Sequence, residues 1–194
     1  MKKYAKAPAS SGKHVVMILD ESGSMASRQN ATVSGFDEYI AKMQADLPDA
    51  TFTLMRFDSS KQDLTHKAVP IKDVGPLTNY QPGQMTPLYD AIGKAVKFAE
   101  SLVGKVFVTI ITDGQENASR EFNRKSIFDI IAEKERQGWA FSYLGIHADA
   151  WDEAQKMGVA ICYTAQSDSV GKAYELSNTY AMSYFKDPKD AGNA

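Results

Sequence analysis

The chain lacks several features that would place it in a specialised class of protein. Its 194 residues include one cysteine, Cys162, which excludes an internal disulfide and a cysteine-rich zinc site. No run of about 18 apolar residues occurs, so we expect no transmembrane helix. The N-terminal segment MKKYAKAPASSGKH contains lysines but no apolar stretch that would make it a secretory signal. These absences predict a soluble protein of a reducing compartment, and we expect it in the cytoplasm.

The sequence also lacks a strong excess of charge of either sign. Its formal net charge is −2, so no overall electrostatic attraction to nucleic acid or to an anionic membrane is expected. Hydrophobic residues make up 43% and charged residues 24%, a balance typical of globular proteins rather than disordered ones. We therefore predict one domain over residues 14–186, between a flexible N-terminal arm (1–13) and a polar C-terminal tail (187–194).

Short apolar runs alternate with amphipathic segments along the chain. The predicted strands are 14–20, 51–58, 64–70, 105–112, 140–147 and 160–165, and the predicted helices are 26–46, 90–102, 124–137, 152–157 and 168–186. The runs at 14–20 and 105–112 are almost wholly apolar, as in strands that are buried on both faces. The more polar run 64–70 ends at Pro70 and is predicted to be an antiparallel edge strand. This alternation predicts an α/β fold with a mostly parallel sheet covered on both faces.

Oxygen-bearing side chains gather where three of these segments begin or end. Asp20, Ser22 and Ser24 follow the first strand in DESGS. Thr86 lies in QPGQMTPLYDA before a helix, and Asp113 follows a central strand in TDGQEN. Ligands of open α/β sheets bind beyond the carboxyl ends of the strands, so these five residues are candidates for one site. Hydroxyl and carboxylate oxygens suit magnesium, manganese or calcium better than zinc or copper.

The charge of this donor set indicates what a bound metal would do. Three of the five donors are neutral hydroxyls, so at most two carboxylates balance a divalent cation. If the two aspartates act through water or hydrogen bonds, the cation stays electron-poor and keeps its Lewis acidity. The donor set therefore predicts a docking site at which the metal accepts a carboxylate from another molecule.

The three motifs resemble the von Willebrand factor type A domain and its metal-ion-dependent adhesion site. D-x-S-x-S, T-P-L-Y-D-A and T-D-G occur in the expected order, and the element pattern matches from about residue 14 to 186. The resemblance implies a Rossmann-like, doubly wound sheet of six strands in the order 3-2-1-4-5-6, with the 64–70 strand antiparallel at one edge. It also implies a bound magnesium, which Ser22 and Ser24 contact directly. Thr86 would contact it once a ligand is engaged, while Asp20 and Asp113 often act through water.

The resemblance is closer to stand-alone bacterial or phage members than to extracellular adhesion domains. The chain has neither a secretory signal nor the flanking cysteines that such adhesion domains often carry. It therefore implies an intracellular role in which a protein partner donates an Asp or Glu side chain to the metal. Stand-alone relatives often work beside AAA+ ATPases or in multi-subunit assemblies, and we expect a partner of that kind. Neither nucleic acid nor a membrane is expected as a partner.

Two other functions remain open on the sequence. Magnesium-dependent phosphatases of the haloacid-dehalogenase type also place an aspartate at the end of the first strand, but they need a second aspartate where this chain has Ser22. The chain also lacks the G-x-S-x-G, G-x-x-x-x-G-K-[ST] and G-x-G-x-x-G motifs, so we expect it not to be an enzyme. In the other alternative, the five residues only cap helices in a structural subunit with a vestigial site.

Several residues near these motifs are interpreted as structural. Glu21 is predicted to be exposed between two site positions. Glu116 and Asn117 are predicted to lie in a solvated loop, with support of the site residues as the alternative. Trp139 and Trp151 are predicted to close the core where their strand and helix begin.

Overall fold

The computed structural model describes residues 12–147, 149–165 and 170–186. In chain order the elements are β1 (Lys13–Asp20), the 3₁₀ helix η1 (Gly23–Arg28), α1 (Gln29–Asp46), β2 (Thr51–Phe57), β3 (Gln62–Pro70), the 3₁₀ turn η2 (Ile71–Asp73), α2 (Leu88–Ala99), β4 (Lys105–Thr112), α3 (Arg124–Arg136), β5 (Ala140–Gly145), α4 (Ala150–Lys156), β6 (Ile161–Thr164) and α5 (Val170–Phe185). Nearly all of the predicted N-terminal arm and the whole C-terminal tail lie outside the described residues. Within the described part of the chain, no helix is long and apolar enough to cross a membrane.

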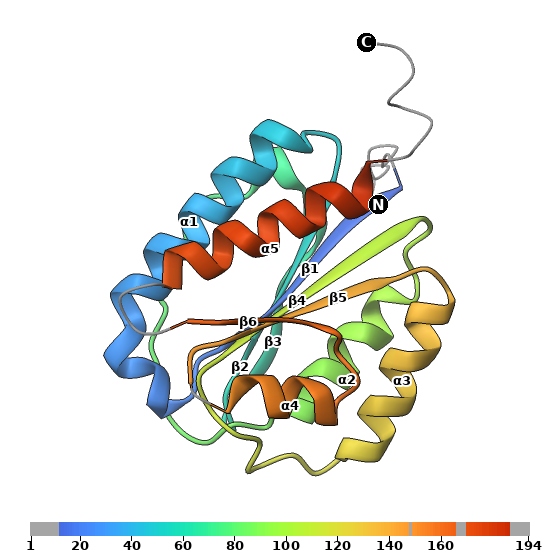
Figure 1. The fold of residues 1–194 in the computed structure, drawn as a ribbon. Coiled ribbons are helices and arrows are strands. Elements are labelled where there is room, and N and C mark those ends of the chain that lie inside the picture. The colour runs from blue at the N-terminus through green and yellow to red at the C-terminus, as the bar shows by residue number, and fades with distance from the viewer. Residues whose placement is uncertain (1–11, 148, 166–169, 187–194) are drawn as a thin grey trace, which may run out of the picture.

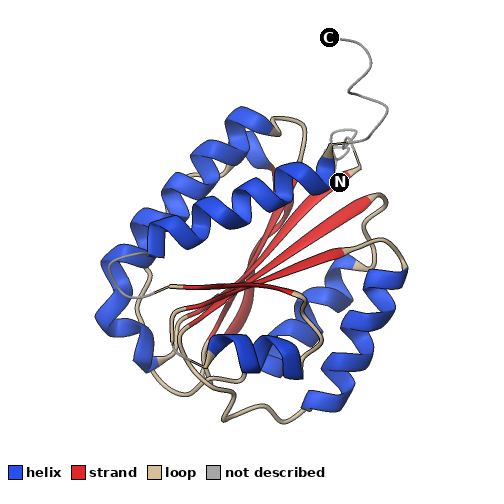
Figure 2. Ribbon diagram, in the orientation of Figure 1, coloured by secondary structure: helices blue, strands red, loops and turns tan. Residues whose placement is uncertain are grey.

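The strands form a single sheet in the order β3-β2-β1-β4-β5-β6 within the described residues (Figure 2). Neighbouring strands run parallel except β2 and β3, which pair antiparallel. The predicted α/β architecture, strand order and antiparallel edge strand are therefore confirmed. The antiparallel pair follows from its short connection, because parallel pairing would require a long crossover.

Helices cover both faces of the sheet (Figure 1). Helices α1 and α5 lie side by side on one face, and α2, α3 and α4 lie on the other. Successive side chains of a strand point to opposite faces, so Val15 and Met17 of β1 pack into the core beneath α1 and α5, while Val16 and Ile18 pack beneath α2 and α3. This double burial explains why the β1 sequence is almost continuously apolar.

The two central strands bring the predicted site to one edge of the sheet. β1 pairs with β4 in a register that sets Leu19 beside Ile111, so Asp20 and Thr112 end neighbouring strands. From β1 the chain continues outward through β2 to β3, whereas from β4 it continues outward through β5 to β6. The direction of winding therefore reverses between β1 and β4, which is where doubly wound sheets form their binding crevice.

The two tryptophans differ in their environments. Trp139 stacks on Phe141 with ring centroids 6.4 Å apart, and the prediction that it closes the core agrees with its partly buried position. The prediction for Trp151 is wrong, because 48% of its surface is exposed. Helix α4 directs Ala150 and Ala154 toward the sheet, and a helix rotates each successive residue by about 100°, so Trp151 faces away from the core.

Candidate metal centre

The conformation of the first loop of the site depends on the carboxylate of Asp20, at the end of β1. One oxygen of this buried carboxylate accepts a hydrogen bond from the Ser22 backbone N–H at 2.7 Å, and the other accepts one from the Thr112 hydroxyl at 2.5 Å. The bond to the residue two positions ahead is an Asx-turn, which reverses the chain without help from a following helix. Asp20 thus shapes its own loop and ties it to the end of β4.

The two serine hydroxyls of this loop face each other. Ser22 Oγ lies 3.1 Å from Ser24 Oγ, and the Ser24 hydroxyl donates a hydrogen bond of 2.5 Å to Asp113 Oδ1. Ser22 stands at the N-cap position of η1, yet its side chain makes no capping hydrogen bond. The capping interpretation therefore does not account for the Ser22 hydroxyl. Ser22 is buried and Ser24 is exposed, so the site opens to solvent on the Ser24 side.

Asp113 supplies the third loop and is held by two different groups. Its Oδ1 accepts from Ser24, and its Oδ2 accepts from Arg28 Nη1 at 2.6 Å. Only 1% of the Asp113 side chain is exposed, against 23% for Arg28. The sequence analysis did not identify Arg28. The spacing of four residues from Ser24 gives no signal either, because both residues lie in a 3₁₀ helix, in which side chains three apart share a side.

Thr86 is positioned by the same loop that follows β4. Its backbone N–H donates to Asn117 Oδ1 at 2.8 Å, and its carbonyl accepts from the Asn117 N–H at 3.1 Å. A Cβ atom placed on Gly114 would lie 3.2 Å from Thr86 Oγ1 and 3.3 Å from Ser24 Oγ. The two hydroxyls therefore approach the same point beside Gly114, so the three loops converge there, and a larger residue would crowd both hydroxyls.

The loop after Asp113 lies at the surface, where Asn117 is exposed as predicted for a solvated loop, but hydrogen bonds also tie the loop to the site. Besides Asn117, the carboxylate of Glu116 accepts hydrogen bonds from the backbone N–H groups of Tyr89, Ala118 and Ser119 at 2.7–2.9 Å. These bonds tie the loop to the first turn of α2. The sequence left such a supporting role open for Glu116 and Asn117, but it could not decide the matter, because Glu and Asn in a loop with glycine also fit a solvated turn.

Glu21 is fully buried, so the prediction that it is exposed is wrong. Its carboxylate pairs with Arg56 at 2.5 Å and with Lys61 at 2.8 Å, and it also accepts a hydrogen bond from the Gln81 N–H. Its carbonyl accepts from the Gly83 N–H at 2.8 Å. Glu21 therefore fixes the segment that leads into the Thr86 loop.

The two site carboxylates differ in their electrostatic surroundings. Burial raises the pKa of Asp20 to about 6, against the lowering effect of hydrogen bonds from Thr112 and Ser22, and the nearby Asp113 adds to the increase. Among the described residues, Asp20 accepts hydrogen bonds only from neutral donors, whereas Asp113 is paired with the Arg28 guanidinium. Ionised Asp20 is thus a buried negative charge that a cation beside it would stabilise.

This donor set fits a hard divalent cation. Contacts link the oxygens of the three loops: Thr86 and Ser24 approach each other beside Gly114, and Ser24 also contacts Ser22 and Asp113. The Asp20 carboxylate is bonded to the Ser22 N–H. Such oxygens match the preferences of magnesium, manganese and calcium. Among the described residues, no group of three or more His, Cys, Asp or Glu side chains is arranged to hold a metal. The fit therefore depends on hydroxyl donors: the residues that would hold the ion are Asp20, Ser22, Ser24, Thr86 and Asp113.

A cavity of about 580 Å³ adjoins this site on the α2 side. Met85 and Pro87, the neighbours of Thr86, line it together with Asn117 and Arg120. Met85 is one of the few large apolar side chains that are strongly exposed, with 52% of its surface accessible. The surface beside the site thus offers an apolar side chain next to polar ones.

Comparison with known proteins assigns the fold. No protein-family model and no curated protein sequence matches the chain. Among solved structures, it resembles the ArnB paralogue VWA2 of Sulfolobus acidocaldarius, at 18% identity and a TM-score of 0.60, over 84% of this chain and 44% of that protein. The VWA domain of SpRpn10 matches at 8% identity and a TM-score of 0.60, over 84% of this chain and 94% of that one.

A third neighbour is the manganese-loaded TRAP protein of Plasmodium vivax, at 11% identity and a TM-score of 0.53, over 86% of this chain and 73% of that protein. The chain spans less than half of the length of the Sulfolobus protein. At these identities the likeness shows the fold alone, which is that of a von Willebrand factor A domain.

Proposed function

We propose that this chain is a protein-binding module that works through a divalent cation, with magnesium as the expected ion and manganese or calcium as alternatives. Asp20, Ser22, Ser24, Thr86 and Asp113 would hold the ion, and an Asp or Glu side chain of a protein partner would bind to it. The observation that carries the proposal is the convergence of three loops whose hydroxyls face one another rather than a helix backbone.

The five residues would contribute to ion binding in two different ways. Ser22 and Ser24 offer neutral oxygens from one turn, and Thr86 offers a third from the opposite loop. Asp20 and Asp113 supply negative charge from buried positions, and both are already fixed by hydrogen bonds from the protein. When bound, the cation supplies a Lewis-acidic position for an incoming carboxylate. The exposed face at Ser24 is the direction from which a partner would approach.

The structural neighbours support the proposal at the level of the module. They include the SpRpn10 VWA domain and a TRAP protein that was crystallised with manganese. The class of partner stays a prediction: a protein that presents an Asp or Glu side chain, in a cytoplasmic multi-subunit assembly or beside an AAA+ ATPase. The cavity beside Met85 could accept the partner residues that flank this acid.

Isothermal titration calorimetry with magnesium tests the metal part of the proposal. Asp20→Asn preserves the shape of the side chain and removes a buried charge, so the variant is expected to fold but to lose magnesium binding. Asp63→Asn removes the same charge from an exposed position on β3 and should bind like the wild type. Magnesium binding that is unchanged in Asp20→Asn would refute the proposed site.

The phosphatase alternative is not favoured by any contact in the structure. The Ser22 hydroxyl, which occupies the position of the required second aspartate, lies against Ser24 Oγ and cannot act as a general acid at neutral pH. Release of phosphate from an aryl phosphate that is lost in Asp20→Asn would nevertheless establish such an enzyme.

A further inference from the structure

Arg28 is the one cation that the structure places in direct contact with a carboxylate of the candidate metal centre, among the residues described. It ends the same 3₁₀ helix that presents Ser24, and its Nη1 atom donates to Asp113 Oδ2 at 2.6 Å and to Ser27 Oγ at 3.0 Å. The site is therefore built with a positive charge already beside it.

This arrangement changes the charge that the centre would carry. Two carboxylates alone would neutralise a divalent cation, because each contributes one negative charge. With the Arg28 guanidinium paired to Asp113, the centre keeps only one net negative charge. A bound divalent cation would then leave a net positive charge at a partly buried position, where charges interact more strongly than in water.

The Arg28 guanidinium is also only partly used. All of its hydrogen bonds to the described residues come from Nη1. Its Nε atom is buried and has no acceptor among the described residues. Guanidinium groups have five N–H donors in a fork that binds carboxylates well, so the hydrogen bonds to the described residues use only part of the donor capacity of Arg28.

Building on the proposed function, we propose that Arg28 couples the binding of the metal to the binding of the partner's carboxylate. By repulsion, its charge weakens the binding of the divalent cation alone. By attraction, it strengthens the binding of an anionic side chain to the metal-loaded site. The expected partner is therefore a protein segment with an acidic side chain that contacts both the bound ion and the Arg28 guanidinium. Coupling of this kind is reciprocal, so the carboxylate must tighten metal binding by the same factor.

Calorimetric titration of manganese, with and without sodium acetate, measures this coupling. Acetate serves as the carboxylate probe, and sodium chloride keeps the ionic strength equal, with free manganese corrected for its weak binding to acetate. In the wild type, acetate should tighten manganese binding by about fivefold or more. In Arg28→Gln, manganese alone should bind about tenfold more tightly, because a like charge has been removed from a position near the ion. The effect of acetate should become smaller without vanishing, because acetate that binds the ion directly still tightens metal binding.

Two controls separate charge from structure. Lys97→Gln removes a positive charge from an exposed position on α2 and should behave like the wild type. Arg28→Lys keeps the charge and should retain most of the coupling. Thermal melting checks that each variant is folded, and Arg28→Met, which keeps an apolar stem, replaces Arg28→Gln if that variant does not fold.

The outcomes distinguish this inference from the proposed function. Weaker manganese binding in Arg28→Gln would show that Arg28 only positions Asp113, and an unchanged acetate effect would show that Arg28 plays no part in the coupling. Either result overturns the inference and leaves the proposed function intact. A folded wild type that binds no manganese, magnesium or calcium would overturn both.

Discussion

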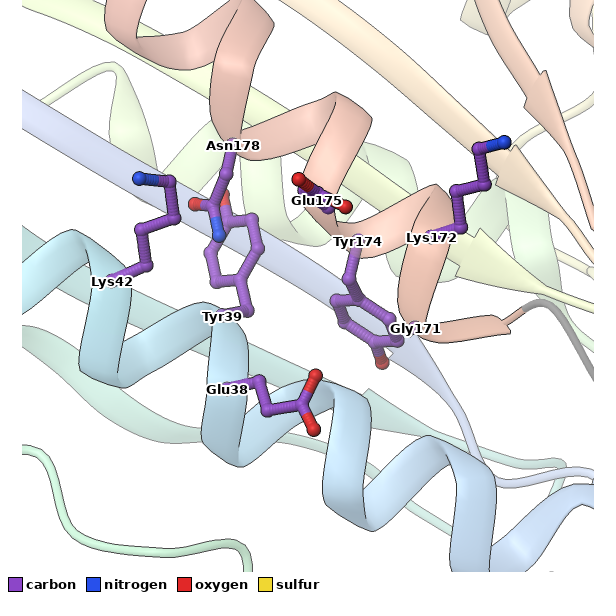
Figure 3. Close-up of a pocket in the computed structure, with 8 residues that line it drawn as sticks. All are labelled: Glu38, Tyr39, Lys42, Gly171, Lys172, Tyr174, Glu175 and Asn178. Carbon is purple, nitrogen blue, oxygen red and sulfur yellow. The ribbon is translucent and has the colours of Figure 1, made fainter.

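At the carboxyl edge of the sheet, the carboxylates of Asp20, Glu21 and Asp113 each accept hydrogen bonds with both oxygens. Between α1 and α5, by contrast, the hydroxyl of Tyr174 and the amide oxygen of Asn178 are buried without a partner among the described residues. A cavity of about 580 Å³ opens there, and Figure 3 shows the Tyr39 and Tyr174 rings lying between the two helices. Buried polar groups without partners destabilise a fold.

The difference between these regions shows where the fold concentrates its polar interactions. In the loops of the metal centre, hydrogen bonds to the carboxylates of Asp20 and Asp113 hold the chain in place. The α1–α5 face is held by apolar packing of residues such as Phe36 and Phe185 and tolerates a few unsatisfied polar atoms. Substitutions should therefore have opposite consequences in the two regions.

Loss of Glu21 should have the largest effect on stability. Glu21→Gln removes the charge that Arg56 and Lys61 share, and breaking such a buried cluster should lower the free energy of unfolding by about 3 kcal/mol. Glu38→Gln, at the exposed rim of the α1–α5 cavity, should change it by less than about 0.5 kcal/mol. Urea denaturation measures both. Equal losses in the two variants would contradict the contrast between the regions.

A pair of glycine substitutions should separate stability from binding. In Gly35→Ala the new Cβ would lie 2.5 Å from the Tyr174 ring, so overpacking should cost about 2 kcal/mol of stability and leave magnesium affinity unchanged. In Gly114→Ala the new Cβ would crowd the hydroxyls of Thr86 and Ser24 at 3.2 and 3.3 Å. Magnesium affinity should then fall by about tenfold, with a smaller loss of stability. Thermal melting and calorimetry of both variants test this, and a reversed pattern would contradict it.

The smallest expected effect is a gain in stability. Tyr174→Phe removes a buried hydroxyl that has no hydrogen-bond partner among the described residues. Burying this hydroxyl costs free energy on folding, because it loses its hydrogen bonds to water. The free energy of unfolding should rise by about 0.5–1 kcal/mol. The matched change at the other region, Thr112→Val, removes a hydroxyl that donates to Asp20 and should be destabilising. Urea denaturation would contradict the comparison if both variants changed stability in the same direction.

Much of the fold was predictable because it depends on local patterns. Strands buried on both faces, such as β1 and β4, are apolar runs, and polar character with a terminal Pro70 marked β3 as an edge. The residues expected at the metal centre follow strands or precede a helix, so their gathering at one edge followed from topology. The supporting contacts were not predictable: whether Glu21 faces solvent or Arg56 depends on how strand β2, 35 residues further along the chain, is placed in the fold.

The two hydrogen bonds between Thr86 and Asn117 limit how the loops of this site can move. The Asn117 side-chain oxygen accepts a hydrogen bond from the Thr86 N–H, and the Asn117 N–H donates one to the Thr86 carbonyl. The two residues are therefore linked in both directions. A shift of Thr86 toward an incoming ligand must then displace the segment between Asp113 and Asn117 in the same direction. The Thr86 loop and the loop after β4 would therefore move together, and an adjustment to a ligand would be concerted.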